Sequence, residues 1–138
     1  MRRRKFHTVR KGRAGRVTRL FAYGTLRRGA PMHGMLAGRV TWLGPASVPG
    51  RLVDLGAFPG LVPAQAAGER VRGDLYALAP DHRDALLDAL DRYEGASFER
   101  VRQRVTGPDG PAVAYLYAYR GDTSRCRVVP GGDYLALR

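Results

Sequence analysis

Short hydrophobic runs, several of them alternating with polar positions, recur along this chain and are typical of strands. They predict strands over 17–23, 39–45, 50–55, 69–78, 98–106 and 112–119. Polar and turn-forming residues between them predict a bend at 45–50 and a hairpin turn at 107–110. The segment 58–64 is too rich in proline for a central strand, so we expect an ordered loop there.

Helical spacing is clear only between residues 80 and 93. The residues that would share one apolar face are Leu86, Leu87, Leu90 and Tyr93. Gly95 would end this helix, and Pro31 can open a shorter one over 31–37. Many short strands with one substantial helix favour a small, mainly antiparallel barrel or curled sheet with helices packed outside it.

The charge is uneven and separates a basic segment from a nearly balanced remainder. The formal charge is +12, and residues 1–19 hold nine Lys and Arg residues and no acidic residue. We therefore expect a basic, disordered tail over 1–17 and one domain over 18–138, whose hydrophobic content suffices for a single core. The tail could make weak, salt-dependent contacts with nucleic-acid phosphates, or it could be an extension without a function.

The sequence lacks the features of several classes of protein and of several kinds of catalytic site. The sequence has no apolar run of the roughly 18 residues that a membrane span requires, so we expect a cytoplasmic protein without membrane contact. Cys126 is the only cysteine, which excludes an internal disulfide. No G-x-S-x-G, Walker or G-x-G-x-x-G motif and no paired-histidine motif occurs, and we expect no metal and no organic cofactor. The histidines are scattered and read as surface or internally hydrogen-bonded residues: His7, His33 and His82.

Two features could carry chemistry. Glu94 lies at the end of the main helix, where helix carbonyls and Asp91 would oppose its ionisation, and a pocket around it would raise its pKa further. A raised pKa suits a proton shuttle, although an exposed glutamate at a frayed helix end fits the same pattern. The other feature is the turn Tyr23-Gly24-Thr25-Leu26, whose backbone N–H groups could hold a carboxylate or an oxyanion, or which could simply end a strand.

The order of several motifs resembles the γ-glutamylcyclotransferase-like, or AIG2-like, family. In chain order these are LFAYGTLRRG, FPGLVP, RVRGDLYAL, LDALDRYEG, FERVRQRV and AYLYAY, within about residues 18–138. The resemblance implies an α+β fold: a small, mixed, mainly antiparallel β-barrel flanked by helices. It also implies a cyclotransferase that converts a γ-glutamyl amine or γ-glutamyl peptide to 5-oxoproline and a free amine.

The resemblance assigns roles to individual residues. Glu94 would be the catalytic acid and base, and Tyr23, Gly24, Thr25 and Leu26 would bind the glutamyl group. Tyr134, in a Gly-Asp-aromatic signature, would help to line the cavity. Phe98 stands where family members commonly have a tyrosine, and its missing hydroxyl could come from Tyr115, Tyr117 or Tyr119, of which we rank Tyr119 first.

Two other functions fit parts of the pattern. A member of the same fold could bind a small molecule without turnover, because a fold does not by itself establish an activity. A nucleic-acid-associated protein is suggested by the basic tail, by Arg100, Arg102 and Arg104 on one strand face, and by a strand whose tyrosines could stack on bases. The sequence does not identify the amine leaving group or the oligomeric state.

Overall fold

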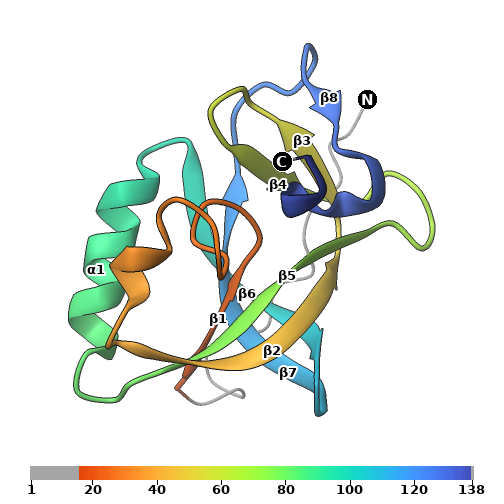
Figure 1. Ribbon diagram of the computed structural model, residues 1–138. Helices are drawn as coiled ribbons and strands as arrows, with labels where there is room; N and C mark the ends of the chain where they lie inside the picture. The colour runs from red at the N-terminus through yellow and green to blue at the C-terminus, as the bar shows by residue number, and fades with distance from the viewer. Residues whose placement is uncertain (1–15, 138) are drawn as a thin grey trace.

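The chain forms a closed five-stranded barrel with extra strands and one α-helix on its outside (Figure 1). The computed structural model describes residues 16–137. The barrel strands, in order around it, are β1 (Arg19–Ala22), β5 (Arg70–Leu78), β2 (Val40–Pro49), β6 (Phe98–Gly107) and β7 (Gly110–Tyr119). Neighbours are antiparallel except at the closure, where β1 runs parallel to β7 with Leu20 opposite Tyr115. The expected mixed, mainly antiparallel barrel is confirmed.

Three further strands extend the sheet beyond β7. They are β4 (Pro59–Val62), β3 (Arg51–Asp54) and β8 (Arg127–Val128). β4 runs parallel to β7, with Leu61 opposite Ala118. One edge of β7 is therefore shared, since β1 pairs with it at Tyr115 and β4 pairs with it three residues further on. The sheet forks at this point, and β1 ends in the fork.

The helical elements lie outside the barrel. They are α1 (Arg83–Glu94) and the short 3₁₀ segments η1 (His33–Leu36), η2 (Pro130–Gly132) and η3 (Tyr134–Leu137). Figure 1 shows η1 and the loop that follows β1, drawn in orange, beside α1. Leu86, Leu87 and Leu90 of α1 are buried, as their spacing predicts, and Gly95, with φ +80°, ends the helix.

Two hydrophobic clusters follow from the alternation of the strands. Phe21 of β1 and Leu116 of β7 point into the barrel, where they belong to the larger cluster. Leu20 of β1 and Tyr115 and Tyr117 of β7 point outward and pack with the leucines of α1 in the second cluster. α1 thus covers the outer side of β1 and β7. The C-terminal end of α1 lies near the point where β1 and β4 separate.

Several local expectations are wrong in detail. β2 continues through the expected bend at 45–50, with a β-bulge between Trp42 and Gly44 and with Pro45 paired opposite Asp74. The expected loop 58–64 contains β4, whose first residue is Pro59, an end position where a missing N–H is tolerated. The expected helix over 31–37 is the single 3₁₀ turn η1.

Most of the expected basic tail, residues 1–15, lies outside the described residues. Within residues 16–137 there is no helix that is both long enough and apolar enough to cross a membrane.

Candidate active site

A pocket of about 170 Å³ opens at the fork where β1 ends. Its walls come from residues 20–26, Phe58, Pro59, Tyr93, Glu94, Phe98 and Tyr117. The pocket therefore joins the turn after β1 to the C-terminal end of α1, two features that lie about seventy residues apart in the sequence. Glu94 and all four residues of the Tyr23–Leu26 turn line the same cavity.

The turn is held by backbone hydrogen bonds that leave the amides of Thr25 and Leu26 without an acceptor among the described residues. Arg27 N–H donates to Gly24 O at 3.0 Å, and Met32 N–H donates to Thr25 O at 2.8 Å. Within residues 16–137 no acceptor is found for the backbone N–H groups of Thr25 and Leu26. Both residues line the pocket, so their N–H groups are candidates to bind an anionic group or a carbonyl oxygen in the cavity.

Gly24 is required by close packing. A Cβ built on Gly24 would lie 2.9 Å from Pro59 Cγ, closer than real Cβ atoms come, and a tight 3.1 Å from Pro59 Cδ. The backbone of the turn and the ring of Pro59 thus touch, which brings β4 and the turn together at the base of the pocket. The sequence predicts a glycine turn here, but it does not reveal the close contact with Pro59 that requires the glycine.

Tyr23 fills the fork between β1 and β4. Its hydroxyl donates to Tyr117 O at 2.6 Å and accepts from Leu61 N–H at 3.2 Å, so it bridges β7 and β4 where β1 leaves the sheet. Burial, together with the negative charge of Glu94, raises the pKa of Tyr23 above its ordinary range. The ring lines the pocket, while the hydroxyl is used to hold the strands.

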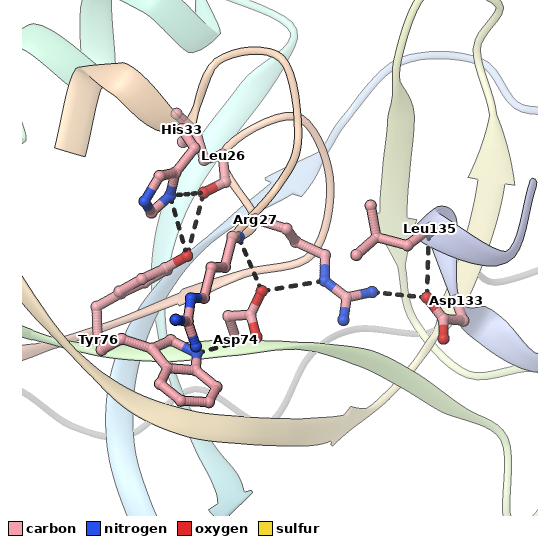
Figure 2. A network of polar contacts seen from close by, with 9 residues as sticks. Leu26, Arg27, His33, Asp74, Tyr76, Asp133 and Leu135 are labelled. Carbon is pink, nitrogen blue, oxygen red and sulfur yellow. Dashed lines mark hydrogen bonds and ion pairs between the residues drawn. The ribbon is translucent and has the colours of Figure 1, made fainter. Parts of the chain in front are cut away.

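A buried polar network fixes the chain that follows the turn (Figure 2). Asp74 of β5 accepts hydrogen bonds from Arg27 Nε at 3.3 Å and from Arg28 N–H at 3.0 Å. Arg27, only 8% exposed, also donates to Asp133 at 2.6 Å. Two carboxylates therefore neutralise one buried guanidinium, and the residues after Leu26 are tied to the barrel wall.

The same network surrounds the carbonyl oxygen of Leu26. His33 Nδ1 lies 3.3 Å from that oxygen, and Tyr76 donates its hydroxyl to the oxygen at 3.4 Å (Figure 2). His33 is thus the internally hydrogen-bonded histidine that the sequence predicts. These contacts fix the Leu26–Arg27 peptide group, which directly follows the turn residues that line the pocket.

Glu94 is the last residue of α1 and is half-buried in the pocket wall. Burial raises the pKa of its carboxyl from 4.5 to about 7. The causes of such a rise that the sequence suggests are the helix carbonyls, Asp91 and a surrounding pocket. Burial is the cause that the structure gives, while the carboxylate of Asp91 is paired with Arg100. A carboxyl with a pKa near 7 can both accept and return a proton at neutral pH.

Asp91, one turn before Glu94, is the centre of a second polar cluster. Tyr117 donates its hydroxyl to Asp91 Oδ1 at 2.6 Å, and Arg100 Nε donates to the same oxygen at 2.9 Å. Burial and the hydrogen bond to Asp91 raise the pKa of Tyr117, which therefore stays protonated. The cluster ties the end of α1 to β6 and β7 and so fixes the backbone from which Glu94 projects.

A direct hydrogen bond also joins two residues of the pocket lining. The hydroxyls of Thr25, from the turn, and of Tyr93, from α1, lie 2.9 Å apart. This contact connects the two elements that carry the expected binding and catalytic groups. The sequence pattern places Tyr93 only on the apolar face of the helix, and its spacing gives no signal of this second role.

The remaining candidates lie elsewhere. Tyr119 packs behind Phe98, with ring centroids 5.3 Å apart, and Tyr134 packs against the barrel core; neither lines the pocket. Tyr117 does line it, so the structure favours Tyr117 over Tyr119 as a source of the hydroxyl that Phe98 lacks. Phe58 also lines the pocket, which the sequence analysis does not predict. The only sequence feature that points to Phe58 is its place in the FPGLVP motif.

Residues 16–137 contain no group of three or more His, Cys, Asp or Glu side chains that could hold a metal ion. The polar groups of the residues that line the pocket include the carboxyl of Glu94, the backbone of the turn and the hydroxyls of Thr25, Tyr93 and Tyr117.

Comparison with solved structures gives the same fold in proteins of bacterial, animal and archaeal origin. YtfP of Escherichia coli is 30% identical, with 86% of this chain and 97% of that one covered and a TM-score of 0.58. An AIG2-like protein of Mus musculus is 23% identical over 87% of this chain and 95% of that one, with a TM-score of 0.62. An uncharacterised protein of Pyrococcus horikoshii is 21% identical over 88% and 92%, with a TM-score of 0.67.

A search of curated proteins found no significant match. The family model described as gamma-glutamyl cyclotransferase, AIG2-like, matches residues 20–136, which span the barrel, α1 and the pocket. The chain therefore belongs to the γ-glutamyl cyclotransferase, AIG2-like family.

Proposed function

We propose that this protein is a cyclotransferase that converts a γ-glutamyl amine or γ-glutamyl peptide to 5-oxoproline and a free amine. The observation that carries the proposal is the half-buried carboxyl of Glu94, with a pKa of about 7, in one pocket with the Tyr23–Leu26 turn. A proton shuttle and a set of backbone donors are the two elements that this reaction needs.

The chemistry begins with the α-ammonium group of the substrate. The α-ammonium group of an amino acid is a weaker acid than a peptide N-terminus, whose pKa is about 8, because the neighbouring α-carboxylate stabilises the cation. Transfer of its proton to a carboxylate of pKa about 7 is unfavourable, but less so than transfer to an ordinary carboxylate of pKa 4.5. The free amine attacks the γ-carbonyl carbon, which forms the ring C–N bond and places negative charge on the carbonyl oxygen. Because nucleophile and electrophile belong to one molecule, holding the chain folded supplies much of the acceleration.

Collapse of the tetrahedral intermediate completes the reaction. Glu94 gives its proton to the leaving nitrogen and takes the surplus proton from the ring nitrogen, and the original amide C–N bond breaks. The released amine then takes this proton from Glu94 and departs as an ammonium ion. Glu94 returns to the carboxylate form, so protons and charges balance without an oxidant or reductant. The N–H groups of Thr25 and Leu26 serve the bound glutamyl group or the oxyanion, and the Thr25–Tyr93 contact keeps them opposite Glu94.

The test compares wild-type protein with a Glu94→Gln variant, which keeps the shape of the side chain but cannot exchange protons. We expect the variant to release 5-oxoproline from γ-glutamyl amides at least about 100-fold more slowly, the usual contribution of a general acid–base group. Asp88→Asn is the matched control, because it removes a carboxylate from an exposed position of the same helix. It should retain wild-type turnover.

Two results would contradict the proposal. One is equal turnover by the wild type and Glu94→Gln. The other is binding of γ-glutamyl amides without release of 5-oxoproline by the wild type, which would favour a non-catalytic binding protein.

A further inference from the structure

A second cavity lies beside the first half of β5, away from the pocket that contains Glu94. Its volume of about 410 Å³ falls within the range of roughly 300–1,000 Å³ found for sites that bind small molecules. Its lining comes from residues 47, 50–52, 68–70, 72 and 128–132, and we call it the β5 cleft. The two cavities share no lining residue, so the β5 cleft is a separate candidate site.

The charged side chains of the β5 cleft are mostly basic. They are Arg51, Arg70, Arg72 and Glu69. Arg51 Nε donates to Glu69 Oε2 at 2.6 Å, and Glu69 Oε1 accepts from the backbone N–H of Gln65 at 2.7 Å. The charge of Glu69 is therefore balanced by Arg51. Arg70 and Arg72 are left without a carboxylate partner within residues 16–137, so the cleft carries an excess of positive charge.

Arg70 is held in place by neutral oxygen atoms. Its Nε donates to Ser47 Oγ at 2.9 Å, and its Nη2 donates to Ser47 O at 3.2 Å and to Thr106 Oγ1 at 3.1 Å. These three hydrogen bonds orient the guanidinium group but leave its charge uncompensated. An oriented guanidinium loses little further freedom when it binds an anion, which favours binding.

Arg72 lies on the same face of β5 as Arg70. Both side chains point away from the barrel interior, because Val71 between them is buried in the core. Arg72 is exposed and forms no hydrogen bond or ion pair with any residue of the described chain. Two residues of a strand span about 7 Å, and two guanidinium groups at that spacing suit a ligand group with more than one negative charge.

A segment with two glycines forms another wall of the β5 cleft. Gly131 and Gly132 have φ values of +72° and +65°, and a Cβ on Gly132 would overlap the carbonyl oxygen of Arg70. Figure 1 shows this segment in dark blue beside the start of β5. Residues 128–132 of this wall carry no charged side chain, so nothing in the wall neutralises Arg70 and Arg72.

We propose that the β5 cleft binds a small molecule that carries a diphosphate group. Arg70 and Arg72 supply the positive charge, and their guanidinium N–H groups match the geometry of phosphate oxygens. The cleft is large enough to hold an organic group beside the phosphates. Because the cleft is separate from the pocket of Glu94, this binding does not depend on the proposed cyclotransferase reaction.

Calorimetric titration of the full chain tests the proposal with inorganic pyrophosphate, ADP and adenosine. The salt concentration is about 0.15 M, at which charges further apart than about 8 Å are largely screened from one another. We expect Kd values below about 1 mM for pyrophosphate and ADP. Adenosine, which has no phosphate, should not bind detectably.

Three variants of equal net charge locate the site. Arg72→Gln should raise the Kd of both phosphates at least about tenfold, and the fold should tolerate it because this side chain forms no bond within residues 16–137. Arg70→Gln should do the same, although it also loses the bonds to Ser47 and Thr106. Arg39→Gln is the matched control, because Arg39 is exposed and lies outside the β5 cleft. Its Kd values should stay close to wild type.

The comparison among these variants is decisive because a chain with a formal charge of +12 attracts any polyanion to some extent. Equal Kd values for Arg72→Gln and Arg39→Gln would overturn the inference, as would failure of pyrophosphate and ADP to bind the wild type below about 1 mM. A short single-stranded RNA is titrated in parallel. If binding of the RNA depends on Arg70 and Arg72 but pyrophosphate does not bind, the cleft is a nucleic-acid surface and the inference is wrong.

Discussion

The hydroxyl of Tyr117 donates a 2.6 Å hydrogen bond to Asp91 Oδ1 and so fastens strand β7 to the last turn of α1, three residues before Glu94. Because a helix is rigid over one turn, a constraint on Asp91 is also a constraint on the direction of Glu94. The bond is partly buried and goes to a charged acceptor, which makes it stronger than a bond between neutral groups.

Tyr117→Phe removes this hydroxyl and leaves the ring in place. We expect the free energy of unfolding to fall by about 1.5–3 kcal/mol, the usual cost of losing a bond to a charged group. Turnover of γ-glutamyl amides should fall as well, because Glu94 loses its alignment. Denaturant unfolding and release of 5-oxoproline measure the two effects.

Tyr119→Phe is the matched control on the same strand face. Among the described residues, no hydrogen bond involves the Tyr119 hydroxyl, so we expect stability and turnover to stay close to wild type. A larger loss in Tyr119→Phe than in Tyr117→Phe would support the sequence-based ranking, which places Tyr119 first.

Tyr23→Phe should destabilise the fork between β1 and β4. The variant leaves Tyr117 O and Leu61 N–H buried without their present partner, at about 1–3 kcal/mol for each unsatisfied group. We expect a loss of about 3 kcal/mol in urea unfolding, with an unchanged dependence on urea concentration. Tyr134→Phe, a half-buried tyrosine whose hydroxyl makes no hydrogen bond within residues 16–137, should lose much less; equal losses would contradict the bridging role.

Gly24→Ala tests the contact between the turn and β4. The new methyl group would lie 2.9 Å from Pro59 Cγ, so the turn must shift, at a cost of about 1–3 kcal/mol of stability and with a loss of turnover. Gly34→Ala, in η1, is the control because its Cβ would meet no heavy atom within 4 Å. If both variants behave alike, close packing is not the reason for a glycine at position 24.

The elements that the sequence predicts well are those defined by local spacing. The leucines of α1 repeat at helical intervals and Gly95 supplies the stop, so the sequence alone is enough to place Glu94 at the helix end. The alternation of Val101 and Val105 likewise identifies β6. These signals depend only on near neighbours in the chain.

The details that the sequence misses depend on contacts between distant segments. Alternation puts Tyr117 and Tyr119 on one face of β7, but the packing of α1 against that face decides which of them reaches the helix. β4 is hidden because Pro59 suggests a loop, although it forms a strand once β3 and β7 provide edges. The pairing of Asp91 with Arg100 also requires the helix to dock on β6.

The last prediction concerns the dependence of stability on pH. In the folded protein the pKa of Glu94 is about 7, against an ordinary value of 4.5 when the chain is unfolded, so between these values the folded state binds more protons. The free energy of unfolding contributed by Glu94 is therefore highest below pH 4.5, falls as pH rises, and reaches its lowest value above pH 7. Glu94→Gln removes this penalty.

Relative to wild type, the variant should thus be more stable at pH 8 than at pH 4, by about 2 kcal/mol once partial exposure of the carboxyl to solvent is taken into account. Urea unfolding of both proteins from pH 4 to pH 8 measures this, and subtracting one curve from the other cancels the titration of groups common to both. Parallel curves would mean that the Glu94 carboxylate is well solvated, and a solvated carboxylate could not serve as the proton shuttle of this pocket.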